Sequence, residues 1–139
     1  MSENLSYRAI RREDLSVICE MPQSAEELFY MFPKAEYPLT IDQMELALES
    51  RFDPTVILYE SEIVGFANFY EVEKSHHCSI GNVVVNSNFR NMGIGEYLIS
   101  TMEDMGLEKY KVEEFHISCF STNIKGILLY TKLGYRPFE

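Results

Sequence analysis

Two hydrophobic patterns alternate along the chain, and together they predict most of its elements. Short runs rich in β-branched and aromatic residues predict strands at 5–10, 56–59, 63–70, 79–85 and 115–120. Apolar positions three or four apart predict helices at 13–19, 24–32, 40–50, 94–105 and about 123–133. The polar triplet 60–62 lies between two strand-like runs and predicts a hairpin.

The order of these elements favours a mixed α/β (α+β) fold. Helices follow the first strand, three strands come in succession, and a strand–helix–strand unit with a final helix completes the chain. Strands joined by a tight turn are antiparallel, whereas a strand–helix–strand crossover makes its two strands parallel. We therefore expect a mixed central sheet flanked by helices. No linker or repeat divides residues 1–139, so a single domain is expected.

A strand that leads into a glycine-spaced loop is the first candidate for chemistry. The apolar run Val83–Val85 is followed by a polar turn, and Arg90-x-x-Gly93-x-Gly95 then opens the next predicted helix. Such a loop presents free backbone N–H groups and the positive end of a helix dipole, which suit a pyrophosphate. The spacing differs from G-x-G-x-x-G and from G-x-x-x-x-G-K-[ST]. On its own, the loop is also compatible with an ordinary strand-to-helix turn.

A second pattern lies in the last predicted helix. Asn123 and Tyr130 are separated by about two helical turns, so they share one face. Ser121 or Thr122 is the expected N-cap, and Gly134 stands where a glycine often ends a helix. Taken alone, Tyr130 is also compatible with a buried core position, and Asn123 with a capping role.

In combination, R-x-x-G-x-G at 90–95 and N-x-x-G-x-x-x-Y-x-x-x-G-Y at 123–135 resemble the two signatures of the GNAT family of N-acetyltransferases. Gly126 stands where that family usually has alanine. The motifs occur in the family's order with a strand-like run between them, and the element order is similar over nearly the whole chain. The resemblance implies the GNAT fold, in which two central parallel strands splay apart around acetyl-CoA.

The resemblance also implies roles for individual residues. The strand backbone at 83–85 would bind the pantetheine and stabilise the oxyanion, and the loop 90–95 would wrap the pyrophosphate. Asn123 would bond the cofactor arm. Tyr130 would protonate the departing CoA thiolate, a step for which a phenol with a pKa of about 10 is competent. The residues predicted to bind acetyl-CoA are Val83, Val84, Val85, Arg90, Asn91, Met92, Gly93, Ile94, Gly95, Asn123 and Tyr130.

The sequence departs from the family at two points. Where the family often has a glutamate on its fourth strand, this chain has Ser79, so the general base stays open among a water relay, Glu71, Glu73, His76, His77 and His116. A last strand normally follows the final helix, but here only residues 135–139 remain, and Pro137 cannot donate a ladder hydrogen bond. We expect that strand to be short or missing, unless the sequence is a shortened product.

The segment 26–37 is the expected wall for the acceptor. It interleaves aromatic and acidic side chains, which suit a cation held by ring faces and carboxylates. The residues predicted to bind the substrate are Glu27, Phe29, Tyr30 and Phe32. The alternative is an aromatic packing cluster beneath a loop that contains two prolines.

Charge and composition narrow the choice of partners. A formal net charge of −10 disfavours nucleic acid and anionic membranes and fits a cationic substrate. We expect neither a signal peptide nor a membrane span. The three scattered cysteines indicate reduced thiols in a cytoplasmic protein, and the spacing of histidine and cysteine predicts no metal site. A monomer or a homodimer is expected.

These observations predict an acyltransferase that moves an acetyl group from acetyl-CoA to a primary amine of a small molecule or peptide, by direct attack in a ternary complex. A non-catalytic acyl-CoA-binding or sensing domain on the same fold is the alternative. The missing fourth-strand carboxylate allows that alternative, and Tyr130 argues against it. A pure interaction module is disfavoured because both cofactor motifs occur together.

Overall fold

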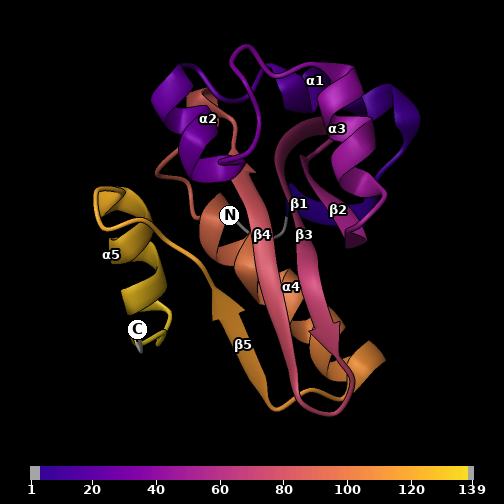
Figure 1. The fold of residues 1–139 in the computed structure, drawn as a ribbon, viewed down its shortest axis with the longest axis vertical. Coiled ribbons are helices and arrows are strands. Elements are labelled where there is room, and N and C mark those ends of the chain that lie inside the picture. The colour runs from indigo at the N-terminus through magenta and orange to yellow at the C-terminus, as the bar shows by residue number, and fades with distance from the viewer. Residues whose placement is uncertain (1–3, 138–139) are drawn as a thin grey trace.

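A five-stranded mixed sheet forms the centre of the molecule, as the element order predicts (Figure 1). The computed structural model describes residues 4–137. The strands lie in the order β1-β2-β3-β4-β5, and every neighbouring pair is antiparallel except β4 and β5, which are parallel. Their bounds are β1 (Leu5–Ala9), β2 (Phe52–Tyr59), β3 (Glu62–Glu73), β4 (His77–Val85) and β5 (Glu114–Ile117).

Helices cover the sheet from different sides. The longest helix lies behind β3 and β4 in Figure 1, three short helices gather at the upper end, and the last helix stands beside the sheet. The bounds are α1 (Leu15–Cys19), α2 (Ala25–Met31), α3 (Ile41–Leu48), α4 (Ile94–Tyr110) and α5 (Ile124–Lys132), with single 3₁₀ turns η2 (Arg12–Asp14) and η3 (Ser87–Phe89). The mixed α/β fold class and the predicted hairpin between β2 and β3 are confirmed.

The core forms two clusters, one for each helical layer. Phe66 is fully buried with residues of α1, α2 and α3, whereas Phe69 is fully buried with the apolar stripe of α4. The side chains of β3 therefore contribute to both helical layers, one on each face of the sheet. Burial of this kind holds short helices that would be marginal by themselves, because helix nucleation is costly.

The parallel pair separates early, and this creates the opening on which the site is built. β4 pairs with β5 only from His77 to Ile80, while β4 itself continues to Val85. The predicted strand at 115–120 is consequently too long, since β5 ends at Ile117. Residues 118–120 leave the sheet and turn toward α2. The predicted splay of the two parallel strands is thus present in the structure.

The end of the chain corrects one expectation and confirms another. The N-cap of α5 is Asn123, whose side-chain oxygen accepts from the Gly126 N–H at 3.1 Å, so the prediction of Ser121 or Thr122 is wrong. Gly134 ends the helix with a left-handed φ of 98°. Between α5 and residue 137 the described chain forms no further strand. Residues 138 and 139, which belong to the segment predicted as a short or missing strand, lie outside the described residues.

Candidate active site

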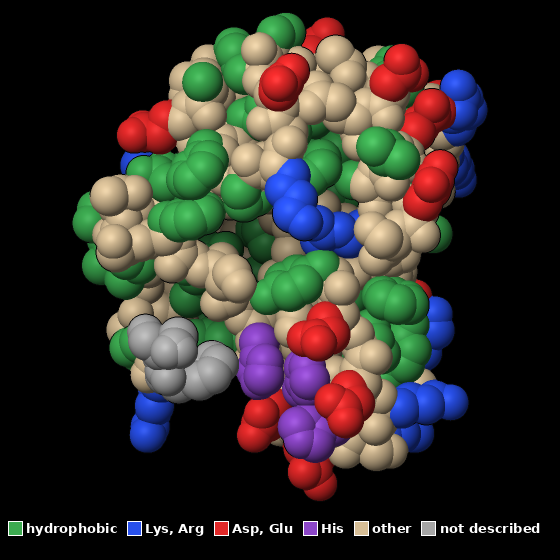
Figure 2. Space-filling view, viewed as in Figure 1, with side chains coloured by type: hydrophobic (Ala, Val, Ile, Leu, Met, Phe, Trp, Pro, Cys, Tyr) green, Lys and Arg blue, Asp and Glu red, His purple; other side chains and the backbone are tan. Residues whose placement is uncertain are grey.

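A cleft of about 1120 Å³ opens where β4 and β5 separate. Strand β4 forms its floor, α2 and residues 118–122 form one wall, and the N-terminus of α4 with one face of α5 forms the other. Figure 2 shows this region as a hollow with hydrophobic side chains on its walls and cationic side chains at its edge. Among the predicted site residues, those that line the cleft are Glu27, Tyr30, Phe32, Val83, Val84, Val85, Arg90, Asn91, Gly93, Ile94, Gly95, Asn123 and Tyr130.

The glycine loop presents unprotected amides to the cleft. Gly93 is the N-cap of α4 with φ 79°, a left-handed conformation that favours glycine, and no side chain caps this helix. By contrast, side-chain oxygens cap α2, α3 and α5. The first amides of a helix have no intrahelical acceptor, so those of Ile94 and Gly95 are available to a ligand. The arrangement suits an anion such as a pyrophosphate.

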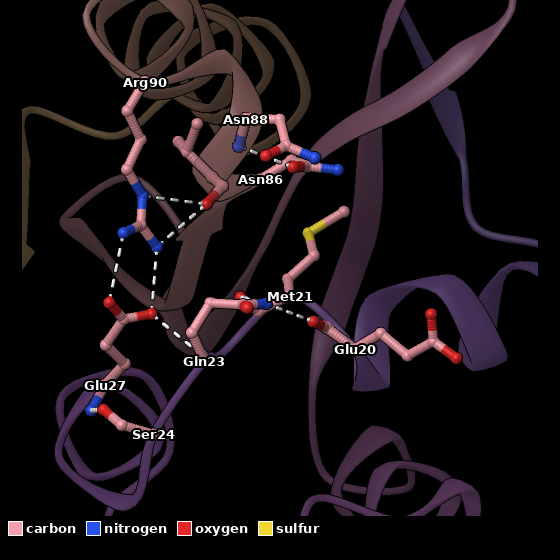
Figure 3. Close-up of polar contacts among 9 residues, drawn as sticks. Glu20, Met21, Gln23, Ser24, Glu27, Asn86, Asn88 and Arg90 are labelled. Carbon is pink, nitrogen blue, oxygen red and sulfur yellow. Dashed lines mark hydrogen bonds and ion pairs between the residues drawn. The ribbon is translucent and has the colours of Figure 1, made fainter.

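Arg90 joins the two sides of the cleft (Figure 3). Its guanidinium donates to both carboxylate oxygens of Glu27 at 3.1 Å, and it also donates to the Val85 carbonyl at 3.2–3.3 Å. The hydrogen bond from Arg90, more than any other contact, holds the pKa of Glu27 below its usual value. Two residues predicted for separate roles are therefore partners, and the ion pair ties α2 to the end of β4.

Tyr130 lies in the cleft with its hydroxyl unengaged by any described residue. Burial is the main cause that raises the pKa of its phenol well above the ordinary value, and nearby Cys119 adds to it. The ring packs edge-on against Tyr135, with 6.2 Å between centroids. Such a phenol is neutral over the physiological pH range and can donate one proton.

The side chains of two predicted cofactor residues also have roles in the fold. Asn123 lines the cleft, but its side-chain oxygen is committed to capping α5. Met92 does not line the cleft and packs against the core cluster that contains α4. Its side chain thus has a packing role, while its backbone remains part of the loop.

An aromatic group forms the wall on the α2 side. The Phe29 and Phe120 rings stack with 4.5 Å between centroids, and Tyr30 lies 6.3 Å from Phe120. The Tyr30 hydroxyl donates to the Thr122 Oγ1 atom at 2.9 Å. Phe29 itself does not line the cleft and instead supports Phe120, which does. Sequence reasoning missed Phe120, because nothing in the chain indicates that residues 118–122 fold back onto α2.

A buried amide chain fixes α2 to the sheet and was also missed. Asn68 donates to the Asn82 side-chain oxygen at 3.0 Å, and Asn82 donates to the Met31 carbonyl at 2.9 Å. Asn82 has φ 51° at an irregularity in the β3–β4 register and lines the cleft. Since both amides are buried, their hydrogen bonds set the position of α2 strongly. The sequence signal that could have revealed this contact is an asparagine within each of two predicted apolar strands, Asn68 in 63–70 and Asn82 in 79–85.

The histidines form a separate cluster at the other end of β4. His77 Nε2 lies 3.0 Å from a Glu71 carboxylate oxygen, its Nδ1 lies 2.9 Å from His76 Nδ1, and its ring stacks on His116. Ser79 also donates to Glu71. Figure 2 shows these side chains with acidic neighbours below the hollow. None of the three histidines lines the cleft.

The structure contains one group of side chains that the sequence did not predict as a potential metal site. Glu73, His76 and His77 each bring one potential ligand atom within 4.8 Å of the others, so this group could hold a metal ion. Their spacing along the sequence is not a usual metal-ligand pattern, and it is the β3–β4 turn that brings the three side chains together. We assign this cluster no part in acetyl transfer.

The uncapped start of α4 and a phenol that no described residue engages thus line one cleft at the splayed strand pair. Comparison with known proteins shows that the Acetyltransferase (GNAT) family matches residues 17–135. The chain belongs to this family, and it is therefore an acetyl-CoA-dependent acyltransferase. No helix among the described residues is long and apolar enough to cross a membrane.

Relatives extend over almost the whole chain. The spermine/spermidine N(1)-acetyltransferase of Bacillus subtilis (strain 168) is 21% identical, with 96% of this chain and 88% of the relative covered. The spermidine N-acetyltransferase of Vibrio cholerae, solved in complex with CoA and spermine, aligns with a TM-score of 0.79 at 17% identity, covering 99% and 83%. The ribosomal-protein-S18-alanine N-acetyltransferase of Escherichia coli gives 0.74 at 18% identity, covering 97% and 79%.

Proposed function

We propose that this enzyme transfers the acetyl group of acetyl-CoA to a primary amine by direct attack in a ternary complex. The observation that carries the proposal is the position of Tyr130 and the uncapped α4 N-terminus on one opening between β4 and β5. One end of that opening can hold the pyrophosphate of the donor. The other end is lined by side chains of α2 and residues 118–122, where an acceptor can approach.

In this proposal the donor is held mainly by backbone. The amides of Gly93, Ile94 and Gly95 bind the pyrophosphate, and the exposed edge of Val83–Val85 pairs with the pantetheine arm. Arg90 is engaged by Glu27 and by the Val85 carbonyl, so its first role is to fix the loop against α2. Asn123 supports the site by capping α5.

Tyr130 serves as the general acid. The amine nitrogen attacks the thioester carbonyl, the C–S bond breaks, and the phenol donates its proton to the departing thiolate. Burial keeps the phenol protonated until this step. Backbone N–H groups of Val83 or Val85 stabilise the oxyanion that forms during attack. An unengaged phenol in the cleft argues against the non-catalytic alternative.

The acceptor ammonium lies against the aromatic wall of Tyr30, Phe32 and Phe120, which Phe29 supports. Relatives whose names give spermine, spermidine or a protein alanine as acceptor support a primary amine as the common chemistry. No histidine lines the cleft. Of the carboxylates that do, Glu27 and Glu96 are paired with Arg90 and Lys132, and Glu26 is exposed to solvent. We therefore propose that water carries the ammonium proton to solvent.

The location of the enzyme and its number of domains complete the proposal. The cysteines Cys19, Cys78 and Cys119 are free thiols, which fits a reducing compartment such as the cytoplasm. A single domain is proposed because one sheet carries both core clusters.

The test is CoA release from acetyl-CoA with a panel of polyamines, amino acids, aminoglycosides and peptides. With a good acceptor, Tyr130→Phe should lower kcat by about 10²–10⁴-fold and leave the acetyl-CoA Kd unchanged. Tyr97→Phe is the matched control, because its phenol donates to the Leu5 carbonyl outside the cleft. Unchanged turnover in Tyr130→Phe would remove the acid assignment. Acetyl-CoA binding without release by any amine would favour the sensing domain.

A further inference from the structure

Arg51 is a cationic side chain in the cleft that the proposed reaction does not use. It directly precedes β2, and its guanidinium carbon lies 5.6 Å from the centre of the Tyr70 ring. A Cβ atom at Gly81 would lie only 2.9 Å from Arg51 Nη1 and 2.7 Å from Tyr70 Cδ1. Glycine at this position of β4 thus makes room for the stacked guanidinium, which lies directly over the strand.

Arg51 also lacks a counter-charge. Of the four other described cations that line the cleft, Arg90 and Lys132 are paired with Glu27 and Glu96, and Lys34 and Lys125 are exposed to solvent. Among residues 4–137, no carboxylate lies within ion-pair distance of Arg51, and burial lowers its pKa. A partly buried guanidinium without an acceptor is unfavourable, and its five N–H donors fit the two oxygens of a carboxylate. The missing partner points to a ligand.

The position of Arg51 separates this ligand from the cofactor's pyrophosphate. The pairing of β4 with β5 ends at Ile80 and Ile117, so Gly81 and Ser118 stand where the strands begin to part. The Tyr70 hydroxyl lies 2.9 Å from Ser118 Oγ at this point. From Gly81 to Val85 the strand covers about 13 Å, and the phosphate loop lies beyond that. Arg51 therefore faces the acceptor end of the opening.

We infer that the acceptor is an amine that also carries a carboxylate, which Arg51 binds beside the Tyr70 and Ser118 hydroxyls. This inference rests on the proposed N-acetyltransferase function and specifies its substrate class. The ammonium lies against the aromatic wall, and the carboxylate lies on the guanidinium. A polyamine carries only positive charge and would meet repulsion at Arg51. The carboxylate belongs either to a small amino acid or to an acidic residue of a peptide.

The experiment compares acceptors that differ by one charge. The dipeptide amides Ala-Glu and Ala-Gln test the peptide source, 4-aminobutyrate and butylamine test the small-molecule source, and spermidine represents a polycation. We expect kcat/KM to be at least tenfold higher for the carboxylate-bearing member of one of the first two pairs. Arg51→Gln should abolish that preference through KM, and Arg51→Lys should restore part of it. Lys74→Gln, which removes the same charge from the exposed β3–β4 turn, should change nothing.

Two outcomes would overturn the inference while the proposed function survives. In the first, spermidine is the best acceptor and Arg51→Gln has the same kcat and KM as wild type. In the second, Arg51→Gln lowers kcat/KM equally for the carboxylate-bearing and the neutral acceptors. If no amine is acetylated at all, titration of the CoA complex with Ala-Glu amide decides the matter. Binding that Arg51→Gln abolishes would support the carboxylate site although the catalytic proposal had failed. Binding that the substitution leaves unchanged would overturn it.

Discussion

The two sides of the cleft are built in different ways. On the donor side, β4, the glycine loop and the start of α4 are consecutive in the chain, and the groups offered to the ligand are mainly backbone amides. On the acceptor side, side chains come from α2, Arg51, β3 and residues 118–122, segments that meet only in the folded sheet. A site made of backbone requires a few glycines and a helix start. A site made of side chains can change its ligand by single substitutions.

Substitution of Gly95 should have the largest effect, and it should fall on the donor side alone. Gly95→Asp adds a carboxylate where the pyrophosphate binds, so we expect acetyl-CoA affinity to fall more than 100-fold by calorimetry. An acidic residue in the first turn favours the helix, so the fold should remain stable. In Gly95→Ala the new Cβ would meet only the Leu129 side chain at 3.0 Å, and the loss should stay below tenfold. Wild-type affinity in Gly95→Asp would show that the pyrophosphate binds elsewhere.

Substitution of Tyr30 should affect the acceptor side alone. A ring face under an ammonium contributes about 0.5–2 kcal/mol, so Tyr30→Ala should raise the acceptor KM by about 2–30-fold. The acetyl-CoA Kd should not change, because the loop and α5 stay intact. Tyr30→Phe keeps the ring and loses only the hydrogen bond to Thr122, so its KM should remain close to wild type. If wild type, Tyr30→Ala and Tyr30→Phe have equal acceptor KM values, the aromatic wall contributes to packing and does not bind the acceptor.

The same contrast explains how much could be predicted from the sequence. Hydrophobic spacing and turn residues predict the strands, α4 and the Arg90–Gly95 loop, because these are local properties of a contiguous segment. The Glu27–Arg90 pair joins residues 63 positions apart, and the Tyr30–Thr122 bond spans 92. No local pattern specifies such pairs.

Individual residues show where local reasoning fails. Asn123 fits two roles in the sequence, cofactor ligand and helix cap, and only the 3.1 Å bond to Gly126 shows that its oxygen is engaged in capping. No sequence pattern around Arg51 marks it as a site residue. Its place in the cleft depends on Gly81 of β4, which leaves space for the guanidinium although β3 lies between β2 and β4. The fold class was thus predictable, whereas the acceptor side depends on contacts between distant segments.

The Glu27–Arg90 pair links the two sides, and its removal should have a modest effect on both. Glu27→Gln should weaken acetyl-CoA binding by about 2–5-fold and lower Tm by about 2–4 °C, since a partly exposed ion pair contributes up to about 1 kcal/mol. Because its folded-state pKa is lowered from 4.5, Glu27 stabilises the fold above that pH and loses the contribution as the pH falls further. The Tm difference should therefore shrink below about pH 4.

Glu26→Gln is the control for this pair, because it removes the same charge from the neighbouring position in the first turn of α2. Equal Tm and Kd changes in both variants would mean that charge in this region matters and the pairing does not. Thermal unfolding between about pH 3 and pH 7, with the Kd measured at neutral pH, distinguishes the two explanations.

The smallest expected effect is an absence of titration by Tyr130. Burial raises its pKa, so the phenol stays protonated and able to act as an acid throughout the usual assay range. As pH rises, kcat/KM should increase with the fraction of neutral acceptor amine and then level off, without a fall before about pH 10. Tyr130→Phe should lower the whole profile and keep its shape. A falling limb between about pH 8 and 10 that disappears in Tyr130→Phe would show that the phenol is far more exposed during turnover than this cleft allows.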